Sequence, residues 1–138
     1  MKILAALDQT TSGQTVLEKA VDMARQQDAQ LSILLVAENF SDIGDVFDPG
    51  EVNQKLITSA REAGEKYRKA AEALGVTAKV IVESGVSPAD IIVKTAEQAG
   101  AGLIVLGKRT KKGLDRFLIG SVASKVVAHA PCSVLVVR

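Results

Sequence analysis

The chain has 138 residues, of which 47% are hydrophobic, so it is long enough for one domain around one core. Its 17 Lys and Arg side chains are nearly balanced by 16 Asp and Glu. General affinity for nucleic acid or an anionic membrane requires a basic excess, so this balance argues against both. We therefore expect a single domain over residues 1–138 that does not bind nucleic acid.

The cysteine count and the lengths of the apolar runs indicate the cellular compartment. Cys132 is the only cysteine, so no internal disulfide can form, which fits a reducing compartment. The first apolar stretch, residues 3–7, is too short for the apolar region of a signal peptide. No apolar run approaches the roughly 20 residues that span a bilayer. These features predict a cytoplasmic protein without membrane insertion.

Short apolar runs alternate with longer amphipathic segments along the chain. Most runs are apolar at consecutive positions, which is typical of strands covered on both faces in a parallel sheet. The predicted strands are residues 3–7, 31–37, 78–82, 103–106 and 134–137, and the predicted helices are residues 13–27, 51–74, 87–100 and 121–129.

Several of the predicted helices have recognisable faces and ends. Ser87 followed by Pro88 is typical of a helix start, and glycines at positions 75 and 100 are typical of helix ends. The longest helix carries one apolar face, with residues spaced three and four apart. That face consists of Val52, Leu56, Ala60, Ala63, Tyr67, Ala70 and Leu74.

The alternation of strands and helices predicts an α/β fold. Right-handed crossovers of such units give a doubly wound, five-stranded parallel sheet with helices on both faces. In open parallel sheets, ligands bind beyond the carboxyl ends of the strands, where the strand order reverses. The residues that directly follow each predicted strand are therefore the candidates for a functional site.

The segment after the fourth predicted strand has the features of an anion-binding site. Residues 107–113 carry four basic side chains, and Gly120 with Ser121 opens the last predicted helix. Unpaired N–H groups at the start of that helix can bind a phosphate, and glycine permits a close approach of the backbone. A simple helix cap beside a solvated basic loop is the alternative that these residue types leave open.

Residues 107–138 resemble the C-terminal signature of the universal stress protein family. That signature reads Gly, two residues, Gly, nine residues and Gly-Ser, followed by a helix and a tail resembling residues 129–138 of this chain. Residues 7–10, Leu-Asp-Gln-Thr, resemble the family's Val-Asp-Gly-Ser, and residues 100–107 resemble its Gly-Ala-Asp-Leu-Ile-Val-Met-Gly. The similarity extends over the whole chain.

The resemblance implies the strand order 3-2-1-4-5, an adenine nucleotide alpha-hydrolase-like fold, and a site for ATP or AMP. In the nucleotide-binding branch, the positions of Asp8 and Val36 contact adenine and the position of Gly107 lies near the ribose. The positions of Gly120, Ser121 and Val122 contact phosphates, and any Mg²⁺ arrives with the nucleotide. The candidate nucleotide-binding residues are Leu7, Asp8, Gln9, Thr10, Val36, Gly107, Thr110, Lys111, Gly120, Ser121, Val122 and Ala123.

Two of these residues depart from the family pattern. Thr110 stands where the family has its second glycine, so a Cβ can obstruct the approach of the backbone to the phosphates. Gln9 replaces another glycine, close to where the base would lie. Lys111, in contrast, matches a basic position that reaches the phosphates.

Three functions follow as hypotheses from the sequence. The first is an adenine nucleotide-binding regulator or sensor in the stress response, acting through an unidentified protein partner. The second is a stress protein that binds no nucleotide and acts only through dimer and partner contacts. The third and least favoured is an enzyme, and we expect any ATP hydrolysis to be slow because no general base is evident near the phosphates.

The last predicted strand points to self-association. Between Val134 and Val137 it carries neither a charged residue nor a proline that would block pairing at a sheet edge. Members of the family commonly dimerise through this strand. We therefore expect a homodimer.

Overall fold

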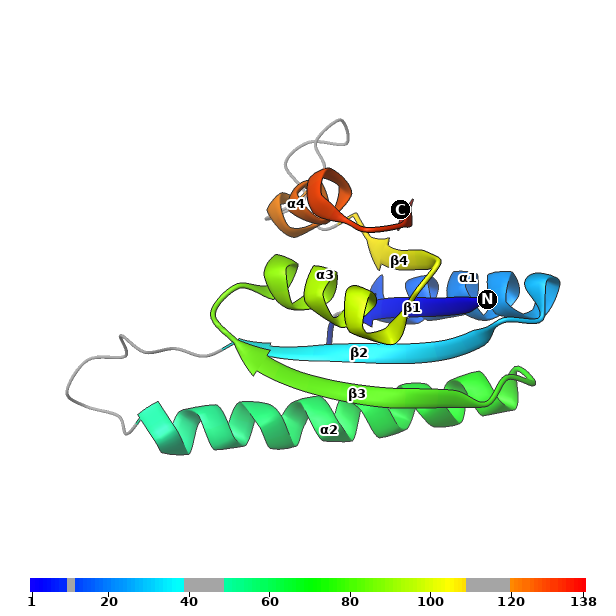
Figure 1. Cartoon of the computed structure of the whole chain (residues 1–138). Coiled ribbons are helices and arrows are strands. Elements are labelled where there is room, and N and C mark those ends of the chain that lie inside the picture. Colours follow the sequence, from blue (N-terminus) through cyan, green and yellow to red (C-terminus); the bar gives the residue numbers. More distant parts are fainter. Residues whose placement is uncertain (10–11, 39–48, 109–119) are drawn as a thin grey trace.

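Five parallel strands form one sheet in the computed structural model, which describes residues 1–9, 12–38, 49–108 and 120–138 (Figure 1). The strand order is β3-β2-β1-β4-β5, which confirms the predicted doubly wound sheet. The elements in chain order are β1 (Lys2–Leu7), α1 (Ser12–Gln27), β2 (Gln30–Glu38), α2 (Pro49–Ala73), β3 (Ala78–Gly85), α3 (Pro88–Ala99), β4 (Leu103–Gly107), α4 (Ser121–His129) and β5 (Ser133–Val137).

Two boundaries differ from the prediction by more than one residue. Strand β3 continues three residues beyond the predicted end, because pairing with β2 persists to Glu38 opposite Gly85. Glu83 and Ser84 interrupt the apolar run there, but both side chains are exposed at the edge of the sheet. Helix α2 begins at Pro49, where a proline in the first turn costs no hydrogen bond.

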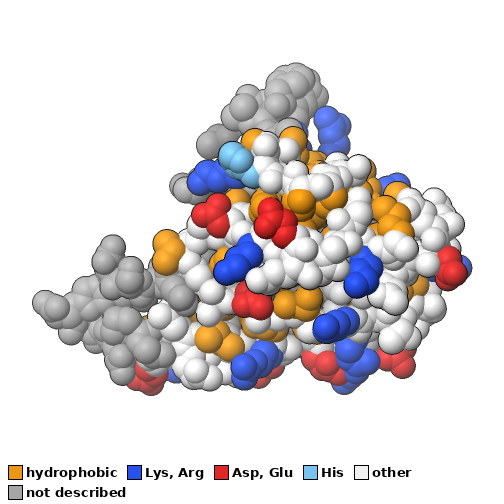
Figure 2. All heavy atoms as spheres, in the orientation of Figure 1, with side chains coloured by type: hydrophobic (Ala, Val, Ile, Leu, Met, Phe, Trp, Pro, Cys, Tyr) orange, Lys and Arg blue, Asp and Glu red, His pale blue; other side chains and the backbone are white. Residues whose placement is uncertain are grey.

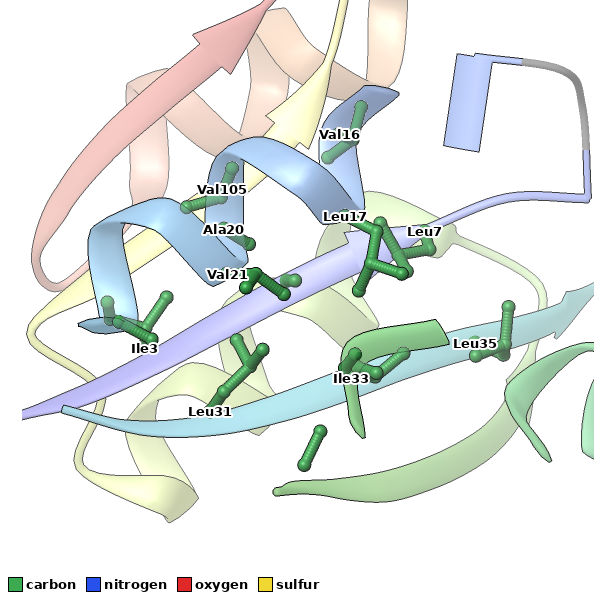
Figure 3. Close-up of a cluster of buried hydrophobic side chains, with 14 of the residues drawn as sticks. Ile3, Leu7, Val16, Leu17, Ala20, Val21, Leu31, Ile33, Leu35 and Val105 are labelled. Atoms are coloured by element: carbon green, nitrogen blue, oxygen red, sulfur yellow. The ribbon is translucent and has the colours of Figure 1, made fainter. Parts of the chain in front are cut away.

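Helices α1 and α2 cover one face of the sheet. Alternate strand residues point to this face, among them Ile3, Ile33 and Val105, and they pack against buried residues of α1 (Figure 3). Helix α2 contributes Ala60 and Ala71 to the same cluster and lies along β2 and β3 (Figure 1). Leu74, predicted to belong to the inward face of α2, lies just beyond the end of the helix at Ala73 and is 39% exposed.

Helices α3 and α4 cover the opposite face. The intervening strand residues Leu4, Leu34 and Ile104 point there and pack against both helices. Helix α3 contributes Ala89, Ile92 and Ala96, and α4 contributes Ala123 and Val126. The two clusters explain why the strands are apolar at consecutive positions, since each successive side chain is buried in a different layer.

A capping serine and two glycines define ends of helices α2 and α3. The amide of Asp90 donates to Ser87 Oγ at 3.5 Å, and Pro88 occupies the first turn of α3. Gly100 ends α3 with a φ of 67°, and Gly75 follows α2 with a φ of 90°. Both glycines adopt the left-handed conformation that other residues avoid, so the predicted helix ends are confirmed.

The outward face of α2 is strongly charged. Lys55 pairs with Glu51, and Arg68 pairs with both Glu65 and Glu72. Side chains of both charges gather along the lower edge of the molecule, where α2 lies (Figure 2). Such exposed pairs contribute little to stability, so α2 is held in place mainly by its inward face.

The core packing yields a stability prediction. Ile33 is fully buried in the layer beneath α1 and α2, so Ile33→Ala leaves a cavity and should lower the free energy of unfolding by about 2–5 kcal/mol. Leu74→Ala, at the partly exposed end of α2, should change it by no more than about 0.5 kcal/mol. Urea titration of both variants measures the difference, and equal losses would contradict the described packing.

Candidate functional site

A cavity of about 340 Å³ opens beyond the carboxyl ends of the strands. Strands β1 and β4 are neighbours, with Leu4 opposite Ile104 and Ala6 opposite Leu106. The helix that follows β1, α1, covers one face of the sheet, whereas the helix that follows β4, α4, covers the other. Such a point of reversal is where doubly wound sheets bind ligands, and the volume is within the range of small-molecule sites. The lining residues are Ala6, Leu7, Asp8, Gln9, Ser12, Gly13, Val16, Leu34, Leu35, Val36, Pro88, Ile92, Leu106, Gly107, Val122 and Ala123.

The cavity walls are mainly apolar. Leu35 and Val16 come from the core layer under α1 and α2, whereas Leu34, Ile92 and Leu106 come from the opposite layer. The cavity therefore lies where the two layers meet at the end of the sheet. Walls of this kind suit a flat, largely apolar ring.

Polar groups stand at defined places around these walls. Asp8 carries the one ionisable side chain among the described lining residues, and it is half-buried directly after β1. Gln9 and Ser12 add an amide and a hydroxyl. These groups can accept and donate hydrogen bonds at the edge of a bound ring.

Helix α4 directs its first turn at the cavity. Val122 and Ala123 line the cavity, and first-turn amides have no partner within their own helix. Together with the helix dipole, these amides favour a negatively charged group. The arrangement can thus hold a ring on apolar walls and an anion at the start of α4.

The cavity brings together seven of the candidate nucleotide-binding residues. Gly120 and Ser121 open α4 but are not among the described lining residues. Gly120 is the buried N-cap with a φ of −59°, a value open to other residues, so only its small size can matter. The candidates Thr10, Thr110 and Lys111 lie outside the described residues. The seven are Leu7, Asp8, Gln9, Val36, Gly107, Val122 and Ala123.

Sequence reasoning missed the strand residues Ala6, Leu34, Leu35 and Leu106 and the starts of two helices in the wall. Ser12, Gly13 and Val16 belong to the start of α1, and Pro88 and Ile92 belong to the start of α3. A signal was present, because a helix that follows a parallel strand begins at the carboxyl end of the sheet, where the site lies. The predicted candidates lay at the ends of strands and at the start of the last helix, so the starts of α1 and α3 were not among them.

Helix α2 also reaches the turn after β1, although no residue of α2 lines the cavity in the described structure. The Tyr67 hydroxyl donates a hydrogen bond to the Asp8 carbonyl oxygen at 2.5 Å. The Ser59 hydroxyl donates to Gln9 Oε1 at 2.9 Å. Both acceptors belong to residues that line the cavity.

Burial raises the pKa of the Tyr67 phenol, and the nearby Asp8 carboxylate raises it further. Both effects act against the phenolate, since one removes water from it and the other places a negative charge beside it. The hydroxyl therefore remains protonated, and able to donate, throughout the neutral pH range.

The described residues lack two features, a metal-binding cluster and a membrane-spanning helix. They contain no group of three or more His, Cys, Asp or Glu side chains placed to hold a metal ion. In the same part of the chain, no helix combines the length and apolar character needed to cross a membrane.

The fold and the cavity define a doubly wound, Rossmann-like α/β protein with a ligand-sized site at the point where the strand order reverses. The model of the universal stress protein family matches residues 1–138, and the chain belongs to this family. It is 35% identical over 147 residues to the universal stress protein YxiE of Bacillus subtilis, covering 99% of this chain and 98% of the relative.

Solved structures of the family share the fold. The universal stress protein UspA from Lactobacillus plantarum matches with a TM-score of 0.86 and 28% identity, over 100% of this chain and 97% of that chain. The universal stress protein from Archaeoglobus fulgidus in complex with dAMP matches with a TM-score of 0.76 and 23% identity, over 100% of this chain and 98% of that one. The second likeness concerns the fold alone.

The raised pKa of Tyr67 gives a pH prediction. Tyr67 is the only tyrosine, so the ultraviolet absorbance of phenolate reports this residue alone. In the folded protein the absorbance should rise at a higher pH than in the urea-unfolded chain, where the pKa is about 10. The stability that this group contributes is complete below about pH 10 and is lost as pH rises through the folded pKa. Titration of the folded chain at or below the pH of the unfolded chain would contradict the described environment.

Proposed function

We propose that residues 1–138 form one domain that binds an adenine nucleotide, ATP or AMP, and acts as a regulator or sensor in the stress response. The observation that carries the proposal is the cavity at the reversal of strand order, whose lining combines apolar walls with the start of α4. A nucleotide likewise combines a largely apolar ring with an anionic chain.

In this proposal the base is bound near Asp8 and Val36. Val36 and Leu35 supply apolar contact for the ring, and the Asp8 carboxylate accepts a hydrogen bond from an amino group. Gly107 ends β4 at the cavity, where the absence of a side chain leaves room for the ribose.

The phosphates are bound at the start of α4. Val122 and Ala123 line the cavity in the first turn of α4, where backbone amides can bind an anion, and Ser121 adds a hydroxyl at the first helical position. Thr10, Thr110 and Lys111 enter the proposal through the family resemblance alone. Any Mg²⁺ is carried by the nucleotide.

The comparisons support this assignment from outside the chain. The structural relative from Archaeoglobus fulgidus was solved in complex with dAMP, which is itself an adenine nucleotide. Universal stress proteins are generally regulatory rather than enzymes. We therefore propose that occupancy of the site, rather than turnover, is the output that a protein partner reads.

Calorimetric titration with ATP and with AMP tests the proposal. Asp8→Ala removes a charged acceptor and should weaken binding at least about ten-fold. Gly120→Val adds bulk at the buried N-cap of α4 and should abolish saturable binding. Ser124→Ala, exposed beyond the first-turn amides, serves as the control and should bind like the wild-type chain. A wild-type chain that binds neither nucleotide would instead support the alternative function through dimer and partner contacts alone.

We further propose a homodimer through β5. In the described sheet β5 is the outermost strand beyond β4, and its residues Ser133–Val137 include neither a charge nor a proline. Its apolar side chains, Val134 to Val137, are only partly buried. An unprotected apolar edge of this kind favours pairing with a second copy.

A single substitution in β5 can test dimerisation through this edge without unfolding the chain. The Lys108 amide donates to the Val137 carbonyl, so the peptide groups of Val137 face β4 and those of Val136 face the open edge. Val136→Pro removes an outward N–H and should give a monomer in sedimentation velocity at micromolar concentration. Unchanged helical circular dichroism would show that the fold survives. A persistent dimer would argue against β5 as the interface.

A further inference from the structure

Helix α2 makes two side-chain hydrogen bonds to the turn that follows β1. Tyr67 bonds the Asp8 carbonyl oxygen at 2.5 Å, and Ser59 bonds Gln9 Oε1 at 2.9 Å. The donors are separated from their acceptors by 59 and 50 residues along the chain. Along the helix, the donors themselves lie about 12 Å apart. Two separate points of α2 therefore hold consecutive residues of one turn.

The bond to Asp8 fixes more than one residue. A peptide group is planar, so holding the Asp8 carbonyl oxygen sets the orientation of the whole unit that joins Asp8 to Gln9. That orientation directs the side chains of both residues, and both line the cavity. Tyr67 thereby bonds the peptide that joins two cavity residues, and it is not itself among the described lining residues.

Gly13 permits the close approach of Tyr67. A Cβ at position 13 would overlap the Tyr67 hydroxyl and would lie 2.7 Å from the Asp8 carbonyl oxygen. The tyrosine tip, the start of α1 and the turn after β1 are thus packed without space for one methyl group. Packing of this density leaves the Asp8 carbonyl little freedom to rotate.

We propose that Tyr67 is a positioning residue for the base of the nucleotide, acting through the Asp8–Gln9 peptide, with Ser59 as a weaker second support. The inference rests on the proposed function, because the ligand is the adenine nucleotide assigned there. Tyr67 orients the acceptor groups of the site before the ligand arrives, which lowers the entropy lost on binding.

Tyr67→Phe and Ser59→Ala test the inference. Phe retains the ring that packs in the layer under α2 and removes only the donor. Tyr67→Phe should weaken ATP and AMP binding about five- to ten-fold, the effect of one neutral hydrogen bond. Ser59→Ala should weaken it by about two-fold or less, because the Ser59–Gln9 bond is exposed to water.

Two control variants separate positioning from general damage. Thr58→Ala removes a neighbouring α2 hydroxyl that donates to the Gln54 carbonyl of its own helix, so affinity should not change. Val21→Ala lowers stability through a buried residue of α1 that does not line the cavity. If lost stability alone weakened binding, Val21→Ala would weaken it as well.

A nuclear magnetic resonance measurement on the ligand-free protein detects the hydrogen bond itself, separately from the packing of the ring. The carbon-13 resonance of the Asp8 carbonyl should shift in Tyr67→Phe, because the carbonyl loses its phenolic donor, and should not shift in Thr58→Ala. A shift together with weakened binding supports the inference.

The remaining outcomes overturn the inference in distinguishable ways. Wild-type binding with unchanged affinity in Tyr67→Phe overturns it and leaves the proposed function standing. Equal loss of affinity in Tyr67→Phe and Val21→Ala also overturns it, because the effect is then one of stability. A wild-type chain that binds neither ATP nor AMP overturns the proposed function, and the role of Tyr67 toward the base with it.

Discussion

The pairing of β1 with β4 is the constraint on which the rest of the structure depends. From β1 the chain turns to α1 on one face, and from β4 it continues to α4 on the other. Because the two helices diverge, neither covers the strand ends between them, and a space remains there. The cavity is therefore a consequence of strand order, and the side chains determine only what it can hold.

The side chains around that space belong to both core layers. Leu7 and Val16 are members of the layer under α1 and α2, and Leu106 and Ala123 are members of the opposite layer. A ligand that fills the space would extend both layers at once and would bury apolar surface belonging to each. Occupancy would thus stabilise the whole domain.

The sequence predicted the strands of the sheet well, but it predicted the residues around the site less completely. Consecutive apolar residues in each strand revealed burial on two faces, and the glycines at positions 75 and 100 marked helix ends that the structure confirms. Local signals did not predict that β3 continues through Glu83, because pairing with β2 decides that end. Tyr67 was predicted correctly as an inward residue of α2, but its contact with Asp8 depends on where α2 lies across the sheet, which no local pattern records.

The position of α2 is set by close approach to the sheet. A Cβ on Gly64 would come within 2.6 Å of Val80 Cγ1, and Ala60 and Ala71 are fully or nearly fully buried, so small residues let the helix lie directly on β2 and β3. Ser59 and Tyr67 lie within the same 25-residue helix as these contacts. A shift of the helix along the sheet would therefore move both donors relative to the turn after β1. The geometry of the cavity thus depends on packing between α2 and β3, at the far side of the sheet from β4.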